Sequence, residues 1–267
     1  MTLAVDVAAV HKVFNAGRSN QVDALTDVHL QVAAGEFVSL IGPSGCGKST
    51  LLRLIADLLE PTQGSITVND KSPRQARLDQ DYGMAFQQAG LFEWRTVAKN
   101  IELPLELKGW DKAKRQARSH EMLELVKLPD RAHAMPWQLS GGQQQRIAIA
   151  RALAAHPSLL LMDEPFGALD EMTREHMQAE LLRICGATQT TVVFVTHSIP
   201  EAVYLSDRVV VMSAGPGRIT SIIKVGIDRA RDEETREAKQ FYYKITEVRE
   251  ALRGSEVTSD VRGIENR

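Results

Sequence analysis

The sequence is poor in cysteine, in long apolar runs and in net charge, and each shortage excludes a class of protein. Two cysteines in 267 residues are too few for a disulfide framework or a cysteine-based metal site, so both are expected to be reduced thiols. A formal net charge of -2 gives no electrostatic basis for binding nucleic acid. No apolar run approaches bilayer-spanning length, and the N-terminus, with Asp6 and no basic leader, is unlike a signal peptide. We therefore expect a chain that folds and stays in the cytosol.

One glycine-rich segment lies in the right context to hold phosphate. The apolar run 36–41 predicts a buried strand, and residues 51–55 predict the start of a helix. Nine residues join them: Gly42, Pro43, Ser44, Gly45, Cys46, Gly47, Lys48, Ser49 and Thr50. In a G-x-x-x-x-G-K-[ST] loop, backbone N–H groups turn toward phosphate oxygens and the helix N-terminus adds its positive end. Lys48 is predicted to reach the β- and γ-phosphates and Ser49 to bind Mg²⁺. The alternative is a glycine-rich turn that matches by chance, which the strand and helix on either side disfavour.

Patterning along the chain predicts an α/β core interrupted by helices. Residues 3–10 and 25–32 partly alternate apolar with polar, as antiparallel strands do. From Thr96 to His156 the β-branched runs disappear and helical spacing takes over, which predicts a helical lobe inserted into the core. The core resumes with the apolar run 158–162. Beyond Arg231, four apolar residues recur at helical spacing and predict a C-terminal helix with one packed face: Phe241, Ile245, Val248 and Leu252.

Polar candidates follow four of the predicted strands. They are the phosphate loop after Ile41, Gln87 after Phe86, Asp163 and Glu164 after Met162, and His197 after Thr196. Ligands of open parallel α/β sheets collect at the carboxyl ends of strands, so one sheet edge is expected to hold them all. Asp163 fits a second Mg²⁺ anchor, and Glu164 is placed to polarise a water for attack on the γ-phosphate. Each has a plainer alternative: a helix N-cap for the two acids, a half-buried histidine for His197 and a loop amide for Gln87.

A second glycine motif changes the balance between these interpretations. Ser140, Gly141 and Gly142 stand at the predicted start of a helix, in the run 139–146. They form a second anion-binding helix terminus with no role at the first loop of the same chain. This predicts a second nucleotide contact, most simply across a dimer.

With these motifs in order, the chain resembles the nucleotide-binding subunits of ATP-binding cassette (ABC) transporters, from Phe14 to about residue 220. The matched positions are the Walker A loop Gly42–Thr50, the signature Leu139–Gln143, the Walker B strand with its catalytic glutamate Leu159–Glu164, the Q-loop Gln87, the D-loop Ala168–Asp170, the switch histidine His197 and the adenine-stacking aromatic Phe14. On spacing alone, a single phenylalanine such as Phe14 is more often a core residue than one that stacks on a base.

The resemblance implies a fold and its boundaries. The fold class is α/β, a P-loop NTPase core with a mixed or parallel sheet, an antiparallel β subdomain and an inserted helical subdomain. The ATPase domain is expected over residues 1–230, with the helical subdomain at about 88–157. A C-terminal helix and a frayed tail are expected over 231–267.

The resemblance also implies a mechanism and partners. Two copies are expected to form a homodimer around ATP and Mg²⁺, with integral membrane permease subunits and, indirectly, an extracytoplasmic solute-binding protein. The subunit would lie peripherally on the cytoplasmic face of the inner membrane. Implied roles are phosphate binding by the Walker A loop, Mg²⁺ binding by Ser49, Gln87 and Asp163, catalysis by Glu164, His197 and Gln87, a D-loop contact by Asp170, and contact with the partner copy's ATP by Ser140, Gly141, Gly142 and Gln143.

Three segments are similar to the subunits serving nitrate, sulfonate and taurine importers: 162–170, 194–203 and 216–219. One departure is Glu93, which stands before Trp94 where that group usually has proline. A rival is a soluble ABC ATPase acting on ribosomes or DNA. Such relatives usually carry two cassettes, a coiled-coil insertion or zinc-binding cysteines, and this sequence has none of these features. A nucleotide-dependent regulator without hydrolysis would lack Glu164 or His197, and both are present.

Overall fold

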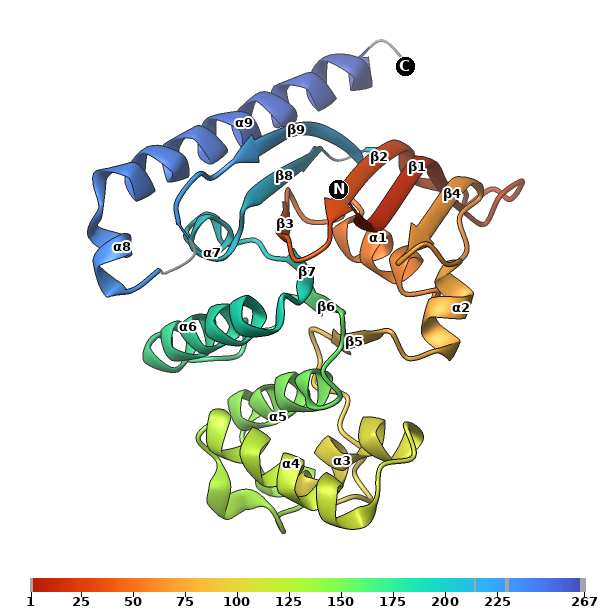
Figure 1. The fold of residues 1–267 in the computed structure, drawn as a ribbon. Helices are drawn as coiled ribbons and strands as arrows, with labels where there is room; N and C mark the ends of the chain where they lie inside the picture. The colour runs from red at the N-terminus through yellow and green to blue at the C-terminus, as the bar shows by residue number, and fades with distance from the viewer. Residues whose placement is uncertain (1, 214, 229–230, 265–267) are drawn as a thin grey trace. The chain divides into compact units, whose positions relative to one another are not determined.

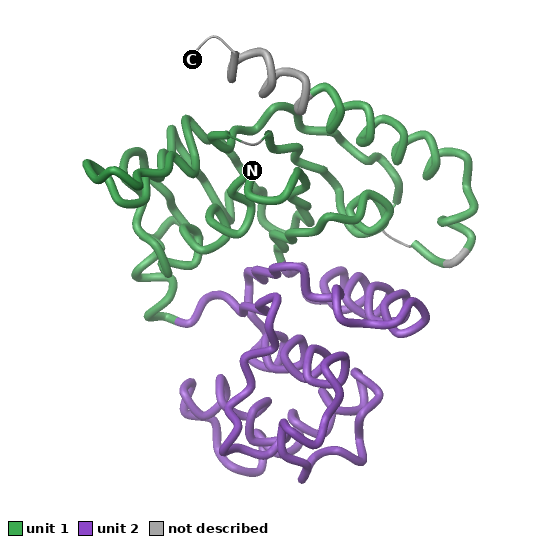
Figure 2. The backbone as a smooth tube through the Cα atoms, turned by 180° about the vertical axis from the view of Figure 1, so that it is seen from behind, with its two compact units in different colours: residues 1–79, 191–267 green, residues 80–190 purple. Residues whose placement is uncertain are grey.

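A computed structural model of the chain describes residues 2–213, 215–228 and 231–264. It contains two compact units (Figure 2). Unit 1 comprises residues 1–79 and 191–267, and unit 2 comprises residues 80–190. Figure 1 labels the strands and helices in chain order.

Unit 1 contains an antiparallel sheet of three strands in the order β2-β1-β4. Their bounds are Leu3–Phe14 for β1, Val22–Ala33 for β2 and Gln63–Val68 for β4. In β1 the side chains of Val5, Val7 and Val10 are buried, whereas Asp6 and Ala8 between them are half-buried and Ala9 is exposed. This alternation is typical of a sheet with one covered face.

The second group of strands in unit 1 is mainly parallel. β3 (Phe37–Ile41) pairs in parallel with β7 (Thr191–Val195) and with β8 (Arg208–Ser213). β9 (Arg218–Lys224) pairs antiparallel with β8. Every residue of β3 and β7 is buried, as expected for parallel strands covered on both faces.

The helices of unit 1 are α1 (Lys48–Ile55), α2 (Pro73–Leu78), α7 (Ile199–Leu205), α8 (Glu233–Glu237) and α9 (Lys239–Ile264). α9 packs on α7 and β8 (Figure 1). Of the four residues predicted to form its packed face, Phe241, Ile245 and Val248 are buried, as predicted, and Leu252 is half-buried. The expected frayed tail falls on 255–264, whose side chains are not described, and on 265–267, which lie outside the described residues.

Unit 2 combines two parallel strands with a group of helices. β5 (Tyr82–Ala85) pairs with β6 (Leu159–Asp163). The helical elements are α3 (Val97–Leu107), α4 (Lys112–Leu125), α5 (Gly141–Ala154), α6 (Glu171–Thr188) and the short 3₁₀ turns η1 (Pro129–Arg131) and η2 (Pro136–Gln138). The helices begin at capping residues, since Thr96 accepts from the Lys99 N–H and Asp111 from the Lys114 N–H.

Helices α3, α4 and α5 pack on one another between β5 and β6 in sequence (Figure 1). Ile101, Leu105, Met122 and Ile147 are buried among them. The predicted fold class is thus confirmed, because parallel strands, an antiparallel sheet and inserted helices are all present. The boundaries at 88–157 and at residue 230 stay predictions. Among the described residues, no helix has both the length and the apolar character that a membrane crossing requires.

Candidate functional site

The phosphate loop lies between a buried strand and a helix, as its sequence predicts. β3 ends at Ile41, and α1 begins at Lys48 with Gly47 as its N-cap residue. Gly45 and Gly47 have φ angles of 78° and 91°, in the left-handed region that is costly for residues with a Cβ atom. These glycines therefore allow the backbone to form the tight turn that joins β3 to α1.

Other parts of unit 1 pack closely against this loop. A Cβ atom added at Gly42 would lie 2.4 Å from the carbonyl oxygen of Met212. A Cβ atom added at Gly217 would lie 2.1 Å from the carbonyl oxygen of Cys46, and the Gly217 N–H donates to the carbonyl oxygen of Ala24 at 3.0 Å. Gly217 therefore supports the loop from the turn between β8 and β9. In the sequence it stood out only as part of the segment 216–219, which is similar to the importer subunits.

The start of α1 suits an anionic ligand. Gly47 has no side chain with which to cap the first amides, and the first turn of α1 carries no acidic residue, so the positive helix end is left for a ligand. Lys48 is only 7% exposed. Its Nζ donates to the carbonyl oxygens of Gly42 at 2.8 Å and Pro43 at 3.0 Å. The ammonium group thus lies over the loop, where the phosphates of a nucleotide would meet it.

The remaining side chains of the loop differ in exposure. Ser44 is exposed, Cys46 is fully buried, and Ser49 and Thr50 are half-buried in the first turn of α1. The Sγ atom of Cys46 lies 3.6 Å from the Lys48 Nζ. The position of Ser49 in the first helical turn fits a hydroxyl that reaches a cation held by the phosphates.

His197 lies near the same strand edge of unit 1 as the phosphate loop. In the parallel β3–β7 pair, Leu40 is opposite Val195, so both strands deliver their next residues at one edge. His197 itself is exposed. Its neighbours are anchored, because the Thr196 hydroxyl donates to the carboxylate of Glu201 in α7 and the Ser198 N–H donates to the Thr196 hydroxyl at 3.0 Å. The backbone that carries His197 is therefore fixed on both sides, and the residue itself is exposed.

Phe14 is the last residue of β1 and is half-buried. It pairs with Val22 at the start of β2. The Lys12 Nζ lies 5.1 Å from the centroid of the Phe14 ring, a cation–π distance. Stacking of this ring on adenine stays a prediction.

Gln87 and the two acids lie at one strand edge of unit 2. Ala85 is opposite Met162 in the parallel β5–β6 pair, and the Gln87 Nε2 donates to the Glu164 Oε2 at 3.3 Å. Asp163 is 3% exposed, whereas Glu164 is half-buried with a φ angle of 47°.

The alternative interpretation of these acids as a helix cap is wrong. The chain after Glu164 forms a turn, and α6 begins only at Glu171. The cap of α6 is Asp170, whose carboxylate accepts from the Thr173 N–H at 3.0 Å. This hydrogen bond lowers the pKa of Asp170 below its ordinary value. Capping of α6 therefore does not account for Asp163 and Glu164.

The signature residues form the start of α5. The Ser140 hydroxyl accepts from the Gln143 N–H at 3.3 Å, and the Gln143 Oε1 accepts from the Ser140 N–H at 3.0 Å, which is a capping box. Apart from its chain neighbours and the backbone of its own helix, no described residue has an atom within 4 Å of a Cβ atom built at Gly141, and a Cβ atom at Gly142 would lie 3.1 Å from the Ala168 carbonyl oxygen. The helix start is thus exposed on one side and close to the predicted D-loop on the other.

The predicted residues fall into two groups. Unit 1 holds the adenine-stacking candidate, the phosphate loop and the switch histidine, and unit 2 holds Gln87, Asp163, Glu164, the signature and Asp170. Within each unit, parallel strand ends bring candidates to a common edge. A single edge that holds all four stays a prediction.

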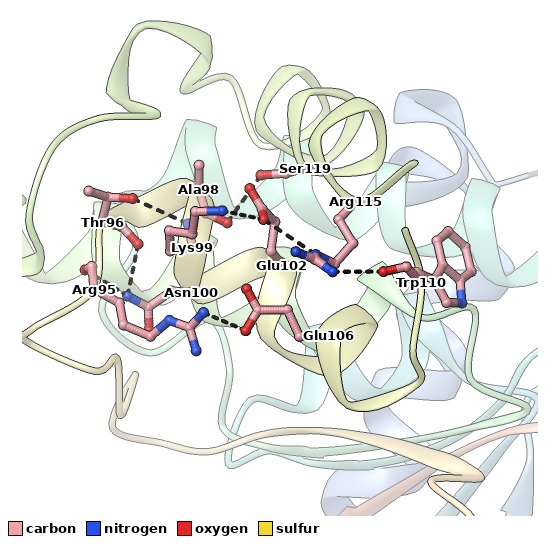
Figure 3. A network of polar contacts seen from close by, with 10 residues as sticks. All are labelled: Arg95, Thr96, Ala98, Lys99, Asn100, Glu102, Glu106, Trp110, Arg115 and Ser119. Carbon is pink, nitrogen blue, oxygen red and sulfur yellow. Dashed lines mark hydrogen bonds and ion pairs between the residues drawn. The ribbon is translucent and has the colours of Figure 1, made fainter. Parts of the chain in front are cut away.

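Three polar side chains of unit 2 had no predicted role. Asn100 and Gln145 are 0% and 2% exposed, and burial lowers the pKa of Arg151. Each hydrogen bonds to the backbone of the segment that carries Gln87 (Asn100 is drawn in Figure 3). The available signal was a polar residue on an otherwise apolar helix face, which marks Asn100 in α3 and Gln145 in α5.

Comparison with known proteins identifies relatives over most of the chain. The sequence model of the family described as ABC transporter matches residues 25–167. An uncharacterized ABC transporter ATP-binding protein of Methanocaldococcus jannaschii is 46% identical over 248 residues, 93% of this chain and 92% of that protein. A bicarbonate transport ATP-binding protein of Synechocystis is 45% identical over 93% of this chain. A nitrate import ATP-binding protein of Synechococcus elongatus is 44% identical over 91% of this chain. The aligned regions span 38% and 37% of the lengths of these last two proteins.

Solved structures give the same result. A dimeric post-hydrolysis state of an ATP-binding cassette, bound to ADP and Pi, matches with a TM-score of 0.76 and 36% sequence identity. The match covers 82% of this chain and 98% of that one. A second dimeric structure, of a bacterial ABC transporter cassette, matches with a TM-score of 0.77 and 37% identity over the same shares.

Proposed function

Because this chain belongs to the ABC transporter family as an ATP-binding subunit, we propose that it powers an importer by closing head to tail with a second copy around two ATP molecules. Its activity as an ABC transporter ATPase follows from the family. The direction of transport, the dimer and the residue roles below belong to the proposal.

In this proposal the phosphate loop of one copy holds the triphosphate. Backbone amides between Gly42 and Thr50 bind the phosphate oxygens, and Lys48 exchanges its contacts with the Gly42 and Pro43 carbonyls for contacts with the β- and γ-phosphates. Phe14 stacks on the adenine. Ser49, Asp163 and Gln87 would hold Mg²⁺, which neutralises charge on the phosphates.

The signature of the partner copy completes each site. Gly141 is exposed at the start of α5, so an anion has access to this helix end. The hydroxyl of Ser140 uses its acceptor side on the Gln143 N–H and keeps its proton for a γ-phosphate oxygen. Gln143 holds this arrangement from within the capping box.

Hydrolysis then requires an oriented water. Glu164 accepts a proton as the water oxygen bonds to the γ-phosphorus and the bond from that phosphorus to the ADP oxygen breaks. His197, with its ring exposed and its backbone anchored through Thr196, stabilises the transferred phosphoryl group. Separation of the products removes the charge that bridges the two copies, and the dimer opens.

The coupling partner is proposed to be a multi-span permease that docks near Gln87–Arg95. Trp94 in this segment is 75% exposed, which suits a docking surface. The relatives named for bicarbonate and nitrate transport support a small anion as solute, and nitrate, sulfonate and taurine are the solutes that we propose. An extracytoplasmic binding protein would deliver the solute, and the subunit would lie on the cytoplasmic face of the inner membrane.

The observation that carries the proposal is the presence of two glycine-rich helix starts in one chain, at α1 and at α5. One nucleotide site needs one phosphate loop, and a second anion-binding helix end is explained by the nucleotide of another copy.

Affinity purification tests the partner. Tagged Glu164→Gln chain is mixed with detergent-solubilised membranes of its host, with and without Mg-ATP, and the bound proteins are identified. We expect a multi-span membrane protein in equal amount to the tagged chain. Ribosomal or DNA-bound partners with nothing from the membrane would instead support the rival ATPase function. The solute is then sought by binding assays on the binding protein encoded beside that permease.

A further inference from the structure

The segment from Phe86 to Thr96 joins β5 to α3 without any helix or strand. It carries Gln87 near one end and Trp94 near the other, both exposed. Leu91 is its one buried apolar side chain, so apolar packing does little to fix its shape. Its backbone polar groups must be satisfied in some other way.

Helix α5 holds the first half of this segment through two side chains. The Gln145 Nε2 donates to the carbonyl oxygen of Phe86 at 2.8 Å. Six residues further along α5, the Arg151 guanidinium donates to the carbonyl oxygens of Ala89 and Gly90, both at 2.9 Å. A planar guanidinium that reaches two successive carbonyls fixes direction as well as distance.

Helix α3 holds the second half through Asn100. Its Oδ1 accepts from the Phe92 N–H at 2.8 Å, and its Nδ2 donates to the carbonyl oxygens of Phe92 at 3.1 Å and Arg95 at 3.0 Å. The Asn100 side chain has no exposed surface. Figure 3 shows it against Arg95 and Thr96, with Arg95 also paired to Glu106 at 2.6 Å.

Trp94 is the exposed side chain whose neighbouring backbone these contacts hold in place. Its ring lies 5.0 Å from that of Phe92, and Phe92 is the residue that Asn100 holds from both its N–H and its carbonyl. Between Gln87 and Trp94, therefore, the backbone is tied at Ala89, Gly90 and Phe92.

We propose that Arg151 and Asn100 are positioning residues that make segment 86–96 a rigid strap, so that a displacement of Gln87 moves Trp94 together with α3 and α5. This rests on the proposed function, in which Gln87 contacts the nucleotide site and Trp94 meets the permease. Both residues act through the backbone of the strap and touch neither ATP nor the partner.

Trp94 fluorescence tests the strap in the full chain. Trp110→Phe and Trp137→Phe leave Trp94 as the one tryptophan of the three in the chain, and Glu164→Gln prevents turnover. We expect Mg-ATP to change the emission of Trp94 in this background. Arg151→Ala and Asn100→Asp should each remove most of that change, while ATP affinity, measured with radiolabelled nucleotide, stays within about threefold because neither residue touches the phosphate loop.

Arg118→Ala is the matched control. Arg118 lies in α4, is 8% exposed and donates to the carbonyl oxygens of Leu153 and Ala154 at the end of α5, so its loss removes a buried arginine from the same group of helices without touching the strap. It should keep the full emission change at a comparable loss of melting temperature. If Arg151→Ala does not fold, Arg151→Lys, which cannot reach both carbonyls with one planar group, should give a partial loss.

A full emission change in both strap variants would overturn the proposal, and so would the absence of any ATP-dependent change in the parent protein. Equal loss in Arg118→Ala would also overturn it, because general destabilisation would then be the cause. Failure of the proposed function is detected separately, since it is judged by whether a permease copurifies with the tagged chain.

Discussion

The two glycine-rich helix starts of this protein differ in how their first amides are satisfied. At α1 the cap is Gly47, which offers no side chain, and Lys48 supplies a positive charge beside it. At α5 the cap is Ser140, which forms a capping box with Gln143, and the first turn contains no basic residue. The first end is built to hold a phosphate by itself. The second already has one of its first amides, the Gln143 N–H, bonded within its own chain, so we expect it to recognise only a phosphate whose charge is largely neutralised by another site.

The difference between the starts of α1 and α5 is easiest to test when hydrolysis is stopped, because both helix starts can then stay bound to phosphate. Glu164→Gln removes the proposed general base, so the rate should fall by about 10² to 10⁴ while ATP binding persists. Phosphate release and size-exclusion chromatography measure the two properties, and the variant should elute as a dimer with Mg-ATP. Brisk hydrolysis by this variant would contradict the role of Glu164.

Breaking the α1 end should abolish tight binding in the copy that carries the change. Lys48→Ala removes hydrogen bonds to a charged ligand worth about 1.5–3 kcal/mol, or roughly 10- to 150-fold in affinity. Equilibrium binding of a fluorescent ATP analogue to dilute monomer measures this loss. Ser140→Ala is the control and should leave monomer affinity unchanged, because α5 acts on the partner's nucleotide. An equal loss of ATP affinity in both variants would mean that the starts of α1 and α5 bind the same nucleotide within one chain.

Mixing the two variants tests whether the ends meet across a dimer. In a head-to-tail dimer of one Lys48→Ala chain and one Ser140→Ala chain, both defects fall in one site and the other site is intact. An equal mixture, half of whose dimers are mixed, should therefore recover about a quarter of the wild-type rate if the sites are independent. Rates are measured before and after mixing. No recovery would mean that each copy completes its own site.

The smallest expected effect distinguishes the role of Ser140 as the N-cap of α5 from its role in hydrolysis. Ser140→Ala should lower the free energy of unfolding by about 1 kcal/mol, and Ser140→Gly by a few tenths, because glycine is tolerated as an N-cap residue. Urea unfolding without nucleotide measures this difference. Both variants should lose hydrolysis equally, since both lack the hydroxyl. Activity that follows stability instead would reduce Ser140 to a structural role.

The sequence predicted those features that are formed by residues close together along the chain. The loop between Gly42 and Thr50 was predicted because its glycines, its lysine and the flanking strand and helix are contiguous. The periodicity of Phe241, Ile245 and Val248 likewise predicted a buried helix face. Delivery of Gln87 and the acids to one edge followed from two parallel strands, and their pairing register confirms it.

The remaining features depend on contacts between distant segments. Nothing near Gly217 in sequence indicates that it lies against Cys46, and nothing near Arg151 indicates that it bonds to Ala89. The acids at 163 and 164 had a plausible local alternative as a helix cap, which failed because the turn after Glu164 delays α6 until Asp170 can cap it. These contacts are determined by tertiary packing, and no short stretch of the sequence predicts them.

The support that Gly217 gives to the phosphate loop has a consequence for protein synthesis. Gly217 exchanges hydrogen bonds with Ala24 and Thr26 and lies against Cys46, so residues near both ends of the ATP-binding region must meet. Long-range contacts of this kind form late in folding, because closing the intervening chain loses conformational entropy before the contacts contribute favourable energy. A growing chain therefore exposes its phosphate motif on leaving the ribosome but acquires a finished loop only after residue 217 has emerged. ATP binding would then stabilise chains that have been synthesised past residue 217 over shorter ones.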